Sequence, residues 1–312
     1  FFSFSLMYGS GGGLVRCFRA RASGCVVECM GVHASTLDEC TLQVCEGEGA
    51  YTVIPAYQGG KIASRWDEHK KRMIDSCRLL DIPNSLSFYE EYNGESLFRY
   101  LLRSCWNKCS FDSARIRVTF DAKLMSKETP EMLVAIEPWK PYPEDHTLLS
   151  DGVRTKTLTP DIIRATPEAK HNGWIHERKK LFAGLEPGIY EVLLTSTQND
   201  CKEDTILEAA GCNFLCLRDE RTVVLPAESV LIGIARAILI DAIKDEFKLV
   251  YEAPTVKEVC QMEEAYLCSA SRGIFPIVEM NGNKIGTGKP GPTFQRLRQL
   301  YLQQLHKELS DI

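Results

Sequence analysis

The sequence contains no apolar stretch long enough to cross a membrane and no long run of positive charge. A membrane-spanning helix needs roughly 20 consecutive apolar residues, and the most hydrophobic segment, residues 229–243, is interrupted by Arg236 and Asp241. The chain carries 37 Lys and Arg residues against 42 Asp and Glu residues, a formal net charge of −5. An acidic chain without a basic patch lacks the electrostatic footprint of a nucleic-acid-binding protein. We therefore expect neither a membrane nor a nucleic acid as a partner.

Closely spaced metal-ligand motifs are also missing. There are 13 cysteines, and the closest pairs, Cys25/Cys29, Cys105/Cys109 and Cys212/Cys216, are each separated by three residues rather than by the two residues of a zinc knuckle. No pair of histidines follows them. We expect no metal site, and we interpret the cysteines as reduced thiols of a cytoplasmic protein or of a plastid or mitochondrial stroma or matrix protein.

Several common enzyme motifs are missing from the chain or from the structural context that they require. The sequence has no strand-flanked GxGxxG, no GxxxxGK[ST], no GxSxG and no HExxH. These absences argue against a dinucleotide-binding Rossmann unit, a P-loop, a nucleophile-elbow hydrolase and a zinc peptidase.

The chain of 312 residues is long enough for about two domains. Three prolines between residues 138 and 151 place a linker at 144–154. A small α/β domain is predicted at 41–143, with strands at 42–56, 114–120 and 132–136 and a helix that ends before Pro83. A larger unit at 155–312 mixes short strands with helices at 234–244 and 293–309. Residues 1–40, with basic residues but no acid among the first 27, are interpreted as an extension, a linker or a transit segment.

Two cationic residues are the first candidates for chemistry. Arg72 follows His69 on the predicted first-domain helix, where a guanidinium could bind an anion with two hydrogen bonds; a solvated surface charge is the alternative. Lys170 lies near His171, His176 and Arg178 in the sequence. A lysine desolvated beside other cations has a lowered pKa and can form a Schiff base with an aldehyde cofactor, although most lysines are simply exposed.

Three turns complete the set of candidates. Glu208 enters a glycine-containing turn, where its carboxylate could pair with a protonated ring nitrogen. Gly233-Ile234-Ala235 begins a predicted helix, and Ser269-Ala270-Ser271 forms a turn of small residues between two predicted strands. Exposed amides at a helix start and at a tight turn bind anions such as phosphate. Each of these segments could also be an ordinary turn.

The order of these motifs resembles that of the class IV aminotransferases, the pyridoxal 5′-phosphate enzymes of fold type IV. The family includes branched-chain and D-amino-acid aminotransferases and aminodeoxychorismate lyase. The resemblance extends from about Gln43 to about Tyr301 and includes a GTGKPGP segment at residues 286–292. It implies an α/β (α+β) fold in which a smaller N-terminal α/β domain and a larger C-terminal mixed-sheet domain enclose the cofactor, and it implies a homodimer.

The resemblance also implies roles for individual residues. Lys170 would hold pyridoxal 5′-phosphate as an internal aldimine and would move the substrate proton. Glu208 would keep the pyridine nitrogen protonated, and Leu231 would pack against the ring. The phosphate would be bound by Arg72 and by the backbone of four further residues, Ile234, Ala235, Ala270 and Ser271.

This chain departs from the family pattern at three places. Ala235 replaces a common Thr, Ile175 stands where branched-chain enzymes have Tyr, and Arg115-Ile116-Arg117 replaces their Tyr-x-Arg. Arg115 and Arg117 are candidates for binding a substrate carboxylate. The leading prediction is an aminotransferase acting on an amino acid and a 2-oxo acid. The alternatives are a lyase that releases pyruvate from aminodeoxychorismate and a catalytically degenerate cofactor-binding or interaction protein.

Overall fold

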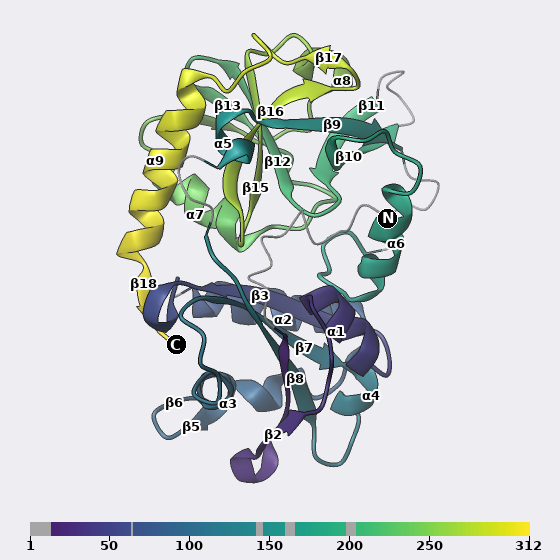
Figure 1. Cartoon of the computed structure of the whole chain (residues 1–312), viewed down its shortest axis with the longest axis vertical. Helices are drawn as coiled ribbons and strands as arrows, with labels where there is room; N and C mark the ends of the chain where they lie inside the picture. Colours follow the sequence, from purple (N-terminus) through teal and green to yellow (C-terminus); the bar gives the residue numbers. More distant parts are fainter. Residues whose placement is uncertain (1–13, 64, 142–145, 160–165, 198–203) are drawn as a thin grey trace. The chain divides into compact units, whose positions relative to one another are not determined.

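The computed structural model describes residues 14–63, 65–141, 146–159, 166–197 and 204–312. These residues form two compact units (Figure 1). The first unit contains the chain up to Pro141 together with Ala169–His176 and Glu308–Ile312, and the second contains Tyr142–Glu168 and Glu177–Lys307. Each unit has its own sheet, as expected of an α/β protein with two domains.

A five-stranded antiparallel sheet forms the centre of the first unit. Its strands, in spatial order, are β2 (Val27–Met30), β1 (Arg16–Arg21), β8 (Glu131–Pro138), β7 (Ala114–Asp121) and β3 (Gly49–Ala56). The expected extension at residues 1–40 therefore differs from the structure over its described part, because β1 and β2 belong to this sheet. Glu131 on β8 accepts a 2.8 Å hydrogen bond from Arg21 and forms an ion pair with Arg19, so a neighbouring strand balances the charge of these two arginines.

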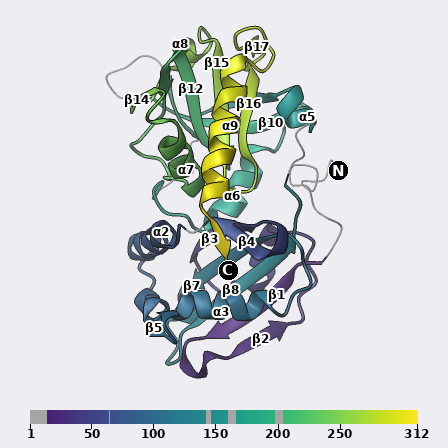
Figure 2. The same cartoon turned by 90° about the vertical axis from the view of Figure 1, so that its left-hand side faces the viewer.

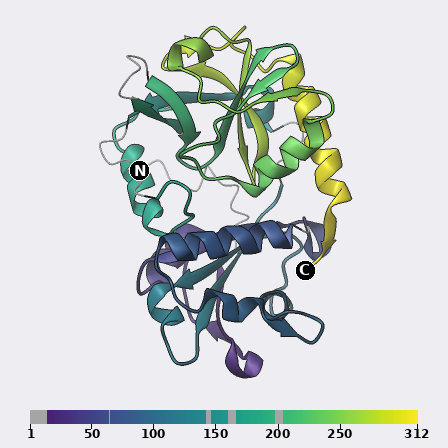
Figure 3. The same ribbon diagram turned by 180° about the vertical axis from the view of Figure 1, so that it is seen from behind.

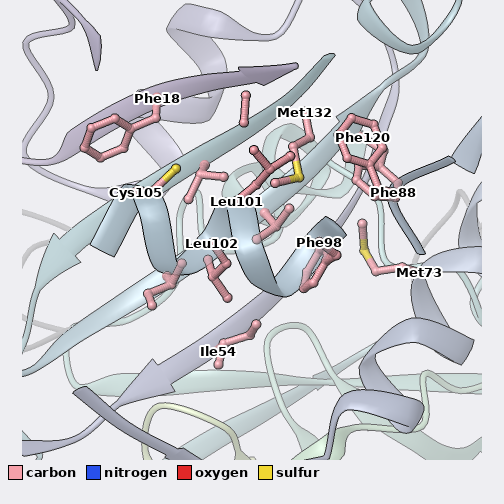
Figure 4. Close-up of a cluster of buried hydrophobic side chains, with 14 of the residues drawn as sticks. Phe18, Ile54, Met73, Phe88, Phe98, Leu101, Leu102, Cys105, Phe120 and Met132 are labelled. Carbon is pink, nitrogen blue, oxygen red and sulfur yellow. The ribbon is translucent and has the colours of Figure 1, made fainter. Parts of the chain in front are cut away.

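One face of this sheet is covered by α2 (Trp66–Leu79) and α3 (Leu97–Trp106). In α3 the apolar residues recur at helical spacing, and Ser96 caps the helix by accepting a hydrogen bond from the Arg99 amide. Figure 4 shows Phe98, Leu101 and Leu102 of this helix directed into a cluster with side chains from the strands. Burying a Leu or Phe side chain stabilises a fold by about 1.5–3 kcal/mol.

Helix α1 (Leu37–Val44) packs on the opposite face of the sheet, where a second apolar cluster includes Leu37, Cys40 and Leu133. Thr36 caps α1 by accepting a hydrogen bond from the amide of Glu39. The strand expected over residues 42–56 was therefore wrong at its start. Residues 42–44 complete this helix, because the cap and the buried stripe outweigh the local strand signal, and β3 begins only at Gly49.

The second unit is built on a nine-stranded mixed sheet with the path β11-β10-β9-β16-β15-β12-β13-β14, on which β17 pairs with β16. Strand β9 pairs in parallel with both β10 and β16, whereas β12, β15 and β16 pair antiparallel. The strands are β9 (Val153–Leu158), β10 (Ile189–Thr197), β11 (Asp204–Ala209), β12 (Asn213–Asp219), β13 (Thr222–Val224), β14 (Lys248–Val250), β15 (Glu264–Ser269), β16 (Gly273–Met280) and β17 (Asn283–Lys284).

Helices α7 (Ile234–Ile243) and α9 (Pro292–Lys307) cover this sheet. Figure 2 shows α9 lying along β16, with Phe294, Leu297, Tyr301 and Leu305 buried on one stripe. Both helices match the predicted segments. Within the described part of the expected linker at 144–154, α5 (Thr147–Ser150) and the start of β9 are regular structure. Residues 144 and 145 of the expected linker lie outside the described residues.

The C-terminal strand β18 (Leu309–Asp311) returns to the first unit and pairs antiparallel with β4 (Lys61–Ala63). Arg65 at the start of α2 donates hydrogen bonds to Glu308 just before this strand, and Figure 3 shows α2 lengthwise in dark blue. Shorter elements are α4 (Ala122–Met125), α6 (Gly173–Leu181), α8 (Val256–Val259), β5 (Glu91–Tyr92) and β6 (Glu95–Ser96). Within the described ranges, no helix combines the length and the apolar character of a membrane span.

Candidate active site

Lys170 is held in the first unit against the outer edge of β3. The amide of Tyr51 donates to the carbonyl oxygen of Lys170 at 2.9 Å, and the amide of Asn172 donates to the carbonyl oxygen of Gly49 at 2.9 Å. The Asn172 side chain accepts from the amide of Gly49 at 2.8 Å and donates to the carbonyl oxygen of Gly47 at 3.1 Å. An edge strand has backbone groups without a strand partner on one side, and the lysine segment binds several of those on β3.

The side chain of Lys170 lies over an aromatic ring of the same unit. Its Nζ atom is 4.8 Å from the ring centroid of Tyr51, and the guanidinium carbon of Arg117 lies 4.5 Å from that centroid. The amide of Lys170 donates to Oγ of Ser76 on α2 at 3.0 Å. Strand β3 and helix α2 thus fix the backbone and the amine of Lys170 together. Tyr51, which motif analysis did not single out, is the ring that contacts the amine.

Arg72 is directed by a buried chain of hydrogen bonds on α2 and β3. Its Nη2 donates to Oγ1 of Thr52, and that hydroxyl lies 2.8 Å from Nδ1 of His69. Burial lowers the pKa of His69 well below its ordinary value, and the charge of Arg72 lowers it further. The imidazole is therefore neutral, and its tautomer decides whether Nδ1 accepts from the Thr52 hydroxyl or donates to it.

The guanidinium of Arg72 has further binding capacity. Burial lowers the pKa of Arg72 to about 10, so the group is still a cation at neutral pH. Among the described residues no acceptor faces its Nε. Burying a guanidinium nitrogen without a hydrogen-bond acceptor costs folding free energy unless a bound anion accepts its hydrogen bond. The predicted role of Arg72 in binding an anion stays a prediction that this geometry fits.

Arg115 and Arg117 lie in the first half of β7 and are each 5 % exposed. Arg115 Nη2 donates to Oε2 of Glu137 at 2.5 Å across β7 and β8. Arg117 donates to Asp38 at 2.6 Å and to the hydroxyl of Thr41 at 2.8 Å, both on α1. Both cations are therefore members of a buried charge network. Their assignment to a substrate carboxylate stays a prediction.

In the second unit, Glu208 is the penultimate residue of β11 and is 5 % exposed. Its Oε2 accepts a 3.2 Å hydrogen bond from the amide of Leu231, so these two candidates are brought together. Asn213, the first residue of β12, fixes the segment beyond Leu231. Its Nδ2 donates to the carbonyl oxygen of Leu231 at 2.6 Å, and its Oδ1 accepts from the amide of Gly233 at 3.1 Å.

Gly233 is required by this close approach. A Cβ atom at position 233 would lie 2.2 Å from Oδ1 of Asn213, which is far inside van der Waals contact. Gly233 is also the N-cap residue of α7, and no side chain caps the helix. Among the described residues, the amides of Ile234 and Ala235 have no acceptor.

The turn between β15 and β16 offers a second pair of amides. Arg272 N donates to the carbonyl oxygen of Ser269 at 3.3 Å, whereas the amides of Ala270 and Ser271 have no acceptor within the part of the chain that the structure describes. Amides at a helix start and amides at a tight turn can each bind an anion, and their joint role in binding a phosphate stays a prediction. This is the arrangement predicted for a phosphate group in the second unit.

Arg236 is a further cation that the sequence analysis did not select. It lies in the first turn of α7, is 3 % exposed, and its Nε has no partner among the described residues. Burial lowers its pKa, and Tyr251, Cys268 and Glu208 oppose that shift. Its position three residues after Gly233 was the available signal, because a basic residue in the first turn of a helix is unfavourable unless an anion is nearby.

Comparisons with known proteins give the same family as the motif order. The model of the family "Amino-transferase class IV" matches residues 49–280. A branched-chain-amino-acid aminotransferase of Pseudomonas aeruginosa is 26% identical over 82% of this chain and 83% of its own length. A branched-chain-amino-acid aminotransferase-like protein 2 of Arabidopsis thaliana is 23% identical over 85% of this chain, which spans 46% of that protein.

A solved structure shares the fold. A hypothetical aminotransferase from Mycobacterium tuberculosis in its PLP-bound form superimposes with a TM-score of 0.68 and 17% identity, covering 93% of this chain and 99% of that one. The two-unit α/β architecture is therefore the fold of a class of aminotransferases, and the predicted fold class is confirmed. The family match covers most of the chain. The protein belongs to the class IV aminotransferase family, as its motif order predicted.

Proposed function

We propose that this chain is a pyridoxal 5′-phosphate-dependent aminotransferase that moves an amino group between an amino acid and a 2-oxo acid. The observation that carries the proposal is the placement of Lys170. Its backbone is fastened to β3 and α2 on both sides of the residue, and its amine is positioned over Tyr51. An exposed structural lysine does not require such anchoring, whereas a covalent attachment point does.

The residues present fit the cofactor. Arg72 and Arg236 each have a buried Nε without a described partner, and Ile234, Ala235, Ala270 and Ser271 offer amides. These groups match the charge and the several oxygens of a phosphate. The Glu208 carboxylate, whose Oε2 is fixed by Leu231, is suited to hold a proton on a ring nitrogen. Leu231 would contact the face of that ring.

When bound, the cofactor supplies an aldehyde that condenses with amines and a ring that accepts electrons. The protein then has to place one base beside the substrate carbon. We assign that role to Nζ of Lys170, which would take the proton from the substrate carbon and hold it for the return transfer. Glu208 would hold a proton on the ring nitrogen, and the anchored backbone of Lys170 would limit the movement of the amine.

The substrates proposed are two small molecules, an amino acid that donates the amino group and a 2-oxo acid that accepts it. Arg115 and Arg117 are proposed to attract the substrate carboxylate. The names of the relatives support a branched-chain aminotransferase-like activity. We further propose that the protein is a homodimer. We also propose that it resides in a reducing compartment, cytoplasmic or organellar, because the 12 cysteines of the described residues are all free.

The first test is covalent labelling. The apo-protein is incubated with pyridoxal 5′-phosphate, reduced with borohydride, digested and analysed by mass spectrometry. We expect a pyridoxyl group on the peptide that contains Lys170. Lys170→Ala should abolish this label, whereas Lys179→Ala, which changes an exposed lysine of α6, should keep it. Label at another lysine in the wild-type protein would refute the assignment.

The second test concerns the reaction. Product formation from an amino donor should require a 2-oxo acid acceptor, and it should show ping-pong kinetics. Release of pyruvate from aminodeoxychorismate without an acceptor would instead indicate the lyase reaction. A protein that is labelled at Lys170 but turns over no donor in a broad panel would contradict an aminotransferase.

A further inference from the structure

Arg272 is a buried cation at the β15–β16 turn, and all of its side-chain nitrogens are used. Its Nε donates to Oγ of Ser269 at 3.1 Å, and its Nη1 donates to the hydroxyl of Tyr190 at 3.1 Å. Its Nη2 lies 3.4 Å from the carbonyl oxygen of Gly211 and 2.6 Å from Sγ of Cys212. The side chain thus joins β10, the turn before β12 and the turn after β15.

The charge of this guanidinium is balanced locally. Glu191 Oε2 lies 3.5 Å from Nη2 of Arg272, and both side chains are at most 4% exposed. Cys212 donates to the same carboxylate oxygen at 3.4 Å. Burial raises the pKa of this thiol, so its proton is present. The guanidinium carbon also lies 5.5 Å from the ring of Tyr190 and 5.3 Å from that of Phe275, which fixes its plane.

Gly211 allows this convergence. A Cβ atom at this position would lie 3.2 Å from Oε2 of Glu191, which is tighter than an ordinary contact, and 3.4 Å from Nη2 of Arg272. Gly211 belongs to the turn that follows Glu208, and Arg272 belongs to the turn that carries Ala270 and Ser271. The two turns that Arg272 connects are therefore those that carry the proposed ring-nitrogen group and the proposed phosphate amides.

We propose that Arg272 is a positioning residue of the cofactor site, which sets the spacing between the Glu208 turn and the Ala270-Ser271 turn. Only a planar fork of donors reaches Ser269, Tyr190 and Gly211 at once, because a lysine presents a single point charge on a flexible stem. The inference rests on the proposed function. It assigns Arg272 no contact with the cofactor itself.

The test compares pyridoxal 5′-phosphate with pyridoxal, which lacks the phosphate. Both are titrated into apo-protein, and binding is followed by absorbance. The ratio of the two association constants measures how well the phosphate amides are placed. We expect Arg272→Met and Arg272→Lys to lower this ratio at least tenfold, which corresponds to about 1.4 kcal/mol. Tyr190→Phe, which removes one hydrogen bond and keeps the ion pair, should lower it less.

The control is Arg154→Lys on β9, because Arg154 forms a 2.7 Å ion pair with Glu279 apart from these turns. It should keep the wild-type ratio. Melting temperatures are recorded in parallel. Arg272 variants that melt earlier but keep the wild-type ratio would show a merely structural role and overturn the inference.

If Arg272→Met does not fold, the ratio of the two association constants measured for Arg272→Lys and Tyr190→Phe tests the inference in the same way. A wild-type protein that binds both compounds equally would contradict the proposed function itself. A wild-type preference for the phosphate that survives in all Arg272 and Tyr190 variants would contradict only the role of Arg272.

Discussion

The contact between Gly233 and Asn213 gives a quantitative prediction. In Gly233→Ala, the new Cβ would lie 2.2 Å from Oδ1 of Asn213, so either the helix start or the Asn213 side chain must move. Overpacking of this kind costs about 1–3 kcal/mol. Displacement of Asn213 also weakens its hydrogen bonds to Leu231 and Gly233, each worth about 1 kcal/mol. We expect a total loss of about 2–4 kcal/mol in the free energy of unfolding.

Asn213→Ala provides the matched single variant. It removes both hydrogen bonds and leaves the backbone groups of Leu231 and Gly233 without these partners, at a cost of about 2 kcal/mol. In the double variant the clash is absent, because the side-chain oxygen that the new Cβ would meet has been deleted. The double variant should therefore be about as stable as Asn213→Ala alone.

The measurement is a double-mutant cycle by urea unfolding of the apo-protein, followed by circular dichroism. A coupling free energy of about 2 kcal/mol or more between the two positions is expected. Additive effects would show that the two residues do not interact as described. The affinity of the variants for the cofactor should follow the same order as their free energies of unfolding, because the Gly233 segment precedes the amides of Ile234 and Ala235.

His69, Asp121 and Leu101 test other parts of the first unit. Because the pKa of His69 is lowered well below 6.5 in the folded state, the unfolded chain binds a proton first as the pH falls. The free energy of unfolding should therefore decline below about pH 6.5 by about 1.4 kcal/mol per pH unit. Urea unfolding of His69→Gln should lack this decline. Asp121 is fully buried and accepts hydrogen bonds from four backbone amides. Asp121→Asn should therefore lower the free energy of unfolding by about 3 kcal/mol. An unchanged urea midpoint would contradict these contacts. Leu101→Ala should cost about 2–5 kcal/mol in the same assay, and a loss below about 1 kcal/mol would contradict its place in the core.

Sequence analysis could predict those residues of the candidate site whose sequence motifs lie within one short segment. A lysine, a turn carboxylate, a glycine at a helix start and a turn of small residues each occupy a short segment, and their order along the chain is typical of one family. Helices α7 and α9 were predicted for the same reason, since an apolar stripe at helical spacing is contained within a single segment.

Strands β1 and β2 were missed because their signal is not local. Burial in β1 does not alternate strictly, as Cys17 and Phe18 are both buried, and Arg19 and Arg21 resemble a basic leader until Glu131 is seen on the neighbouring strand. Pairing with a distant strand decided this segment.

What the sequence determined by itself was the chemistry available: which side chains could be a base, an acid or an anion-binding cation, and the family to which their order belongs. The tertiary structure decided how those groups are held. Tyr51 beneath the amine of Lys170, Asn213 against Gly233 and Arg272 between two turns are contacts between residues 20 or more positions apart. Such contacts arise only when strands pair and helices pack, because side-chain spacing along one segment carries no information about a partner on another.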